Sequence, residues 1–213
     1  MINFPFMVNE LMQFLGSMFR KDGGADDFVD PTPHQDHRAA PTPTMKPPEM
    51  TDEDYAKVIE MGLQDWGKGS APPMATQSAS LAKLGSELPE RYLPAALSIK
   101  ETGALSNSES ARVKNNPYGI GPGVQYPDLE TATLGGGPEN QRGLKGVLLG
   151  REGEPSKYKK YLDSGDLGDF FDTYTPDSDP RNPKNDEQVA MMNQLLDKFM
   201  SAEEKYKKEK GFR

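Results

Sequence analysis

Glu101 is the residue of this sequence whose surroundings most clearly suit chemistry. It closes an apolar stretch, PERYLPAALSIKET at 89–102, in which Leu93, Leu97 and Glu101 follow one another at intervals of four. This spacing predicts a helix with a ridge of leucines that ends on a carboxylate. Burial disfavours the charged form of a carboxyl group, which makes a proton donor available near neutral pH. The alternative is a helix-end glutamate in water, with Lys100 beside it.

A loop of small polar residues follows and leads into a second distinctive segment, NNPYGI at 115–120. A glutamate that ends an apolar helix, followed by such a loop and by NN-x-[FY]-G-I, resembles the glucosaminidase family of peptidoglycan hydrolases, glycoside hydrolase family seventy-three in the lysozyme superfamily. Tyr126, Leu129 and Ala132 fit that family's Y-x-x-[LS]-x-x-[AS] stretch. The resemblance extends over residues 81–200.

The resemblance implies a role for each matching residue. Glu101 would be the catalytic acid, and Tyr174, which precedes Thr175, Pro176 and Asp179, would be the functional tyrosine of the family. The sugar-binding groove would be shaped by a further set of residues: Asn116, Tyr118, Gly119 and Tyr126.

The sequence departs from the family pattern directly after the glutamate. Members have an aromatic residue there, whereas Gly103 is followed by Ala104 and Leu105. Tyr118 or Tyr126 would then have to supply the apolar contact with a sugar. For Tyr118 a place in the core, with its hydroxyl in water, is an equal alternative.

Glycoside hydrolysis normally needs a second group opposite the acid. The candidates are Asp128, Glu130 and Glu139. Asp128 also suits the N-cap of a helix that starts at Leu129, and Glu130 its first turn. We expect Asp128 to be a cap and Glu139, in the loop GGGPEN, to be the mobile carboxylate that closes over substrate.

The residue inventory excludes several other kinds of site. The chain has 213 residues, no cysteine and 2 histidines, His34 and His37, both in a proline-rich stretch. This excludes thiol nucleophiles, histidine-dependent triads and His-ligated zinc in the folded part. The spacing of the oxygen-bearing side chains Asp177, Asp179, Asn182 and Asp186 fits no calcium loop and is more typical of a turn rich in caps. We therefore expect neither a metal nor a cofactor.

Composition divides the chain into five parts. Met7, Leu11 and Phe14 begin an amphipathic helix within 1–20 that needs a partner surface. A proline-rich linker, 21–50, precedes a short helix, 51–67, capped by Thr51 with Asp54. A second linker, 68–80, leads to a main domain, 81–213.

These features predict a mainly α, lysozyme-like domain with a small β-hairpin, preceded by an amphipathic helix and a Pro-rich linker. The expected function is an endo-N-acetylglucosaminidase that cleaves β-1,4 bonds of peptidoglycan. A lytic transglycosylase and a non-catalytic virion structural or adaptor protein remain alternatives.

The expected partners follow from that function and from charge. A net charge of −8 disfavours nucleic acid, and no apolar run is long enough for a transmembrane segment. No signal peptide is evident, so we expect the protein to reach the cell wall or periplasm within a phage virion or through a secretion-apparatus protein bound by residues 1–20.

Overall fold

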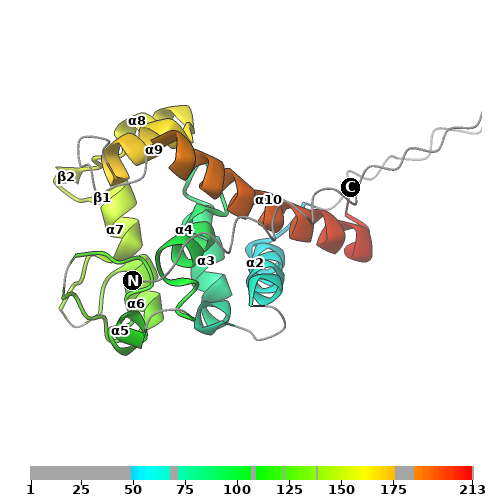
Figure 1. Cartoon of the computed structure of the whole chain (residues 1–213), viewed down its shortest axis with the longest axis horizontal. Coiled ribbons are helices and arrows are strands. Elements are labelled where there is room, and N and C mark those ends of the chain that lie inside the picture. Colours follow the sequence, from blue (N-terminus) through cyan, green and yellow to red (C-terminus); the bar gives the residue numbers. More distant parts are fainter. Residues whose placement is uncertain are drawn as a thin grey trace, which may run out of the picture. The chain divides into compact units, whose positions relative to one another are not determined.

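The computed structural model describes residues 49–67, 72–106, 109–121, 123–137, 139–175 and 185–212. The predicted amphipathic helix at 1–20 and nearly all of the predicted linker at 21–50 lie outside these residues. The described part is mainly helical, with one small antiparallel hairpin, as the sequence predicts (Figure 1). No helix in it has the length and apolar character needed to cross a membrane.

The predicted helix at 51–67 is present as α2 (Asp52–Trp66). Its start is fixed by a reciprocal pair of hydrogen bonds. The Thr51 hydroxyl accepts from the Asp54 amide at 3.2 Å, and the Asp54 carboxylate accepts from the Thr51 amide at 2.8 Å. These bonds satisfy amides that have no partner within the helix.

The predicted linker at 68–80 is wrong in its second half. Residues 73–77 form the 3-10 helix η1 (Pro73–Gln77), and α3 (Ser78–Gly85) follows directly. The small residues and prolines of GKGSAPPMATQSAS at 67–80 suggested a flexible connection. However, Leu81, Ala82 and Leu84 are fully buried, and this packing stabilises the helix.

Four helices surround the largest part of the core. α2, α3 and α4 (Leu93–Thr102) pack together, and the long α10 (Asn185–Lys210) lies against α2 and α4 (Figure 1). The approach of α2 to α10 is close, because a Cβ atom on Gly62 would lie 2.5 Å from Cδ1 of Phe199. The folded domain therefore includes α2 and starts earlier than the predicted boundary at residue 81.

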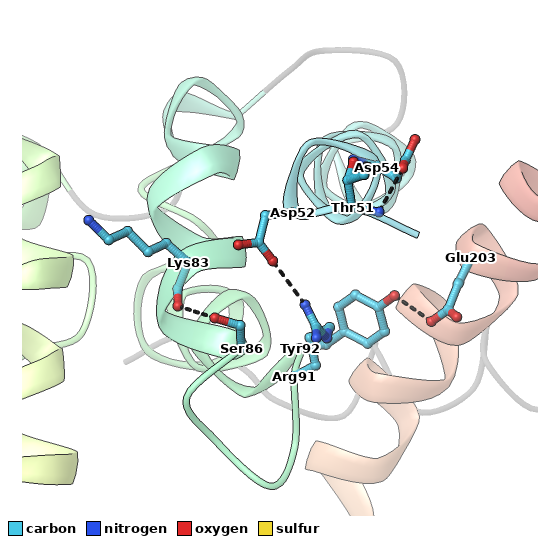
Figure 2. Close-up of polar contacts among 8 residues, drawn as sticks. All are labelled: Thr51, Asp52, Asp54, Lys83, Ser86, Arg91, Tyr92 and Glu203. Carbon is cyan, nitrogen blue, oxygen red and sulfur yellow. Dashed lines mark hydrogen bonds and ion pairs between the residues drawn. The ribbon is translucent and has the colours of Figure 1, made fainter. Parts of the chain in front are cut away.

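Polar contacts around the start of α4 join the same helices (Figure 2). The Tyr92 hydroxyl donates to Glu203 of α10 at 2.5 Å, and the Tyr92 ring stacks on Phe199. Arg91 pairs with Asp52 of α2 at 3.5 Å, and its guanidinium lies 3.7 Å from the ring centre of Tyr55. These contacts hold both ends of the described chain to α4.

The remaining elements form the other side of the domain. α5 (Glu109–Val113) and α6 (Leu129–Leu134) flank the 115–120 loop, and α7 (Gly143–Leu149) packs on α6. The strands β1 (Gly150–Arg151) and β2 (Glu154–Pro155) pair antiparallel, with Gly150 opposite Pro155. α8 (Lys159–Ser164) and α9 (Leu167–Tyr174) follow, and α9 contacts α10.

Candidate functional site

Glu101 occupies the place that the helical spacing predicts. Leu93 and Leu97 are fully buried, and the Glu101 side chain continues their ridge at the last turn of α4 with 24% of its surface exposed. The carboxylate therefore stands at the boundary between core and solvent. A solvent-exposed helix-end glutamate, the alternative, does not describe this position.

α4 ends in an unusual turn directly after Glu101. Gly103, Ala104 and Leu105 have φ angles of 58°, 53° and 70°, so three successive residues adopt the left-handed conformation. For a residue with a Cβ atom this conformation costs about 1–2 kcal/mol. The side chains of Ala104 and Leu105 are buried, which offsets that cost by packing. They are core residues and offer no surface to a sugar.

Thr102 connects this turn to the 115–120 loop. Its hydroxyl lies 3.1 Å from the carbonyl oxygens of both Ser98 and Pro117, and it accepts from the Leu105 amide at 3.1 Å. One buried side chain thus joins the end of α4 to the NNPYGI segment. No role for Thr102 was predicted from the sequence, although a hydroxyl in the last turn of the helix was an available signal.

The loop itself is shaped by Asn116. The Asn116 side chain accepts from the Ile120 amide at 3.0 Å and donates to the carbonyl oxygens of Ile120, at 3.1 Å, and Val124, at 3.4 Å. It is 6% exposed, so its polar atoms serve the loop. The Asn116 side chain thus holds the loop in shape, and substrate binding by Asn116 stays a prediction.

Two tyrosines predicted to bind substrate are core residues. Tyr118 is 1% exposed, its hydroxyl shares a 2.9 Å hydrogen bond with Thr133, and burial raises its pKa. Tyr126 is 2% exposed, and its carbonyl oxygen accepts from the Asn115 side chain at 3.1 Å. Neither ring offers a face for stacking on a sugar, because the core covers both.

Gly119 is exposed and lies beside Glu101. A Cβ atom on Gly119 would stand 3.8 Å from Oε2 of Glu101. Its φ angle of +62° also favours glycine over any other residue. Of the residues predicted to shape the groove, Gly119 is the one that the fold brings to the carboxylate.

Tyr174, at the end of α9, reaches the same place. Its hydroxyl donates to the carbonyl oxygen of Tyr118 at 3.4 Å. Burial, in the first place, and the nearby negative charge of Glu101 raise the pKa of Tyr174 well above its usual value. The phenol is therefore a neutral hydrogen-bond donor at physiological pH, between α4 and the 115–120 loop.

Lys100 is the charged neighbour of this site. Its ammonium group lies 2.8 Å from Oε1 of Glu101, and only 14% of its side chain is exposed. The same nitrogen lies 5.7 Å from the ring centre of Phe171 and 5.5 Å from that of Tyr174. Lys100 lies on a helix whose other residues are mostly buried, and this position was the sequence signal that the lysine would be packed.

The candidates for a second carboxylate lie at the start of α6 and in the loop that follows α6. Asp128 is the N-cap of α6, accepting from the Thr131 amide at 2.7 Å, as predicted, and Glu130 is exposed in the first turn. Glu139 is exposed in a tight loop closed by paired backbone bonds between Gly136 and Gln141. Its role as the mobile second group stays a prediction.

Most of the predicted cap-rich turn is outside the described residues, namely Asp177, Asp179 and Asn182, whereas Asp186 lies in the first turn of α10. Across the described ranges no group of three or more His, Asp or Glu side chains is arranged to hold a metal ion. The site consists of a carboxylate, an ammonium, a phenol and an exposed glycine. This set can donate a proton and bind a polar oxygen.

Comparison of the chain with protein-family models, curated proteins and solved structures found no match.

Proposed function

We propose that this protein is a peptidoglycan hydrolase, an endo-N-acetylglucosaminidase in which Glu101 is the general acid. The observation that carries the proposal is the position of Glu101 beside both Gly119 and Tyr174. These three residues come from separate segments, each of which matches a block of the glucosaminidase pattern. Their meeting at one carboxylate supports that resemblance.

In the proposed reaction Glu101 gives its proton to the glycosidic oxygen as the bond to the anomeric carbon breaks. The acetamido carbonyl oxygen of the same N-acetylglucosamine attacks that carbon and closes a ring. Water then opens the ring and returns a proton to Glu101, which leaves a reducing N-acetylglucosamine end. The Tyr174 hydroxyl is placed to donate a hydrogen bond to the acetamido group or to the water.

Substrate-assisted cleavage is consistent with the carboxylates of the described part. Asp128 caps a helix, Glu130 lies in the first turn of that helix, and Glu139 sits in an exposed loop. The acetamido group would supply the nucleophile that a second carboxylate supplies in other glycosidases. Residues 1–20 would carry the enzyme to the wall by binding a virion or secretion partner.

The test is the substitution Glu101→Gln, which removes the proton and keeps the size and the hydrogen-bond acceptor that faces Lys100. We expect loss of wall lysis in a turbidity assay on purified peptidoglycan, with a melting temperature close to that of wild type. Glu130→Gln is the matched control and should keep full activity. Lysis by Glu101→Gln within a few fold of wild type would remove Glu101 from the mechanism.

Mass spectrometry of the digest identifies the reaction. Reducing N-acetylglucosamine ends are expected. Products that end in anhydro-muramic acid, lighter by one water, would instead assign a lytic transglycosylase. No lysis by wild type would favour the adaptor alternative.

A further inference from the structure

Thr102 follows Glu101 on α4 but faces a different environment. Successive side chains on an α-helix point about 100° apart. Thr102 is accordingly turned into the core and is 6% exposed, whereas 24% of the Glu101 side chain is exposed. A contact made by Thr102 can therefore act on the surroundings of the carboxylate without filling the space that a substrate needs.

The hydroxyl of Thr102 makes one contact that a helical threonine does not need. A threonine in a helix commonly donates to the carbonyl oxygen four residues earlier, and the 3.1 Å contact with Ser98 is of this kind. The 3.1 Å contact with the carbonyl oxygen of Pro117 spans 15 residues and leaves the helix. The hydroxyl also accepts from the Leu105 amide at 3.1 Å. Support of its own helix therefore explains the bond to Ser98 but not the bond to Pro117.

This bond reaches the loop that approaches Glu101. Pro117 precedes Gly119 by two residues, and a Cβ atom on Gly119 would stand 3.8 Å from Oε2 of Glu101. The side chain of Asn116 stiffens the loop, because it accepts from the Ile120 amide at 3.0 Å and donates to the Ile120 carbonyl oxygen at 3.1 Å. A displacement of Pro117 should therefore be passed on to Gly119.

Two other polar contacts of the loop run to different helices. The Tyr118 hydroxyl shares a 2.9 Å hydrogen bond with Thr133 of α6, and the Tyr174 hydroxyl of α9 donates to the Tyr118 carbonyl oxygen at 3.4 Å. Neither contact involves α4. The bond from Thr102 joins the loop to the helix that carries Glu101.

We propose that Thr102 is a positioning residue, whose hydroxyl holds the 115–120 loop, and with it Gly119, at the Glu101 carboxylate. The inference rests on the proposed function. It assigns to Thr102 no contact with the substrate.

The expected effect on the reaction follows from alignment. A general acid must lie within hydrogen-bond reach of the oxygen that it protonates, and a misplacement of about 1 Å can cost about 100-fold in rate. A sugar bound beside Gly119 would keep most of its contacts if the loop moved, but its glycosidic oxygen would no longer be aligned with Glu101. The loss should therefore fall mainly on kcat, with a smaller change in KM.

The experiment compares the full chain carrying Thr102→Val with wild type, because valine keeps the branched shape and removes the hydroxyl. The first measurement is kcat and KM on soluble peptidoglycan fragments, for which we expect a fall of about 10- to 100-fold, mainly in kcat. The second is amide hydrogen exchange by NMR, which needs no activity. The amides of Leu105 and Ile120 should both exchange faster relative to that of Val58, a buried residue of α2. A purely local role would affect Leu105 alone.

Two variants control the result. Thr102→Ser keeps the hydroxyl and should restore both kcat and the slow exchange of Ile120. Ser98→Ala removes another buried hydroxyl of α4, one that donates to the Ala95 carbonyl oxygen at 2.7 Å within the helix. It should leave kcat and the exchange of Ile120 relative to Val58 unchanged. If Thr102→Val fails to fold, Thr102→Ala removes the same hydroxyl and leaves room for a water to bond the freed groups.

Three results would overturn the inference. They are unchanged exchange of Ile120 relative to Val58 in the folded variant without the hydroxyl, an undiminished kcat in that variant, and a kcat that Thr102→Ser fails to restore. An absence of lysis in wild type would overturn the proposed function instead, and faster exchange of Ile120 in the same samples would still show that Thr102 holds the loop. The two failures are therefore distinguishable.

Discussion

The hydroxyl of Thr102 lies 3.1 Å from the carbonyl oxygen of Pro117, and this contact joins the end of α4, which carries Glu101, to the loop that carries Gly119. Thr102 follows Glu101 on α4, and Pro117 precedes Gly119 by two residues. A buried hydrogen bond between such neighbours fixes the spacing of the two segments, because breaking it leaves polar groups without partners. The carboxylate and the exposed glycine thus belong to one rigid unit.

Gly119→Ala tests whether the space beside Oε2 is used. The new methyl group would lie 3.8 Å from Oε2, at a φ angle of +62° that costs a residue with a Cβ atom about 1–2 kcal/mol. Gly123→Ala is the matched control, since Gly123 has φ +85° and no atom within 4 Å of a Cβ position. Both variants should lose similar stability in urea denaturation. Only Gly119→Ala should lose more wall lysis than its loss of stability explains. Equal lysis by Gly119→Ala and Gly123→Ala would contradict a substrate atom beside Oε2 of Glu101.

Tyr174→Phe removes the phenol that faces Glu101. We expect wall lysis to fall by about 10- to 100-fold, the effect of losing a hydrogen bond to a charged or polar reacting group. Tyr158→Phe is the control, because Tyr158 and Tyr174 both stack on Phe170, at 5.3 Å and 5.1 Å between ring centres. Burial raises the pKa of Tyr158 to about 12, so it too stays protonated. Comparable losses in both variants would indicate a packing effect.

Deletion of α2 should unfold the domain, whereas deletion of residues 1–48 should not. Val58, Ile59 and Leu63 of α2 are fully buried, and burying each such side chain contributes about 1.5–3 kcal/mol. Their sum approaches the whole stability of a domain, about 5–15 kcal/mol. Circular dichroism with urea denaturation of residues 49–213 and 68–213 checks this. Cooperative unfolding of the shorter chain would refute it.

Asp54 should stabilise the protein at neutral pH and cease to do so in acid. Hydrogen bonds from the Thr51 amide, the Thr51 hydroxyl and the Tyr206 hydroxyl lower the pKa of Asp54 below its ordinary value. A lowered pKa contributes stability above the unfolded value, about 3.9, that is lost as pH falls through the folded one. Asp54→Asn should therefore lower the melting temperature at pH 7, and its difference from wild type should shrink as the pH falls through the lowered pKa of folded Asp54.

Asp65→Asn supplies the reference for that comparison, because Asp65 is exposed at the other end of α2, where a negative charge is unfavourable to the helix dipole. It should not lower the melting temperature at pH 7. A difference between Asp54→Asn and wild type that persisted unchanged into acid would rule out the titration of Asp54 as its cause.

The elements that the sequence predicted well have local signals. α6 begins at the predicted residue, Leu129, since Asp128 caps it, and α2 (Asp52–Trp66) lies within the predicted range 51–67, since Thr51 and Asp54 fix its start. α3 and α7 were missed because their sequences are rich in small residues or glycine, and their helices depend on contacts with distant elements.

In the candidate site too, the features with a local sequence signal were predictable and those that depend on distant contacts were not. The place of Glu101 in the last turn of α4 follows from helical spacing, and the resemblance to the glucosaminidase pattern indicated Gly119 and Tyr174. The burial of Tyr118 and the use of Asn116 within its own loop depend on three-dimensional contacts with Thr133 and Val124, which no spacing along the chain reveals.

The contacts between α2 and α10 also affect how the domain is made. Asp54 and Tyr206, which are hydrogen-bonded, are 152 residues apart, so at about 5–20 residues per second the ribosome takes roughly 8–30 s to supply the second after the first. Through that interval the apolar face of nascent α2 has no α10 to cover it. Chaperones that bind exposed apolar segments would meet this face of α2 during that interval, and the core would be completed only when α10 has been made.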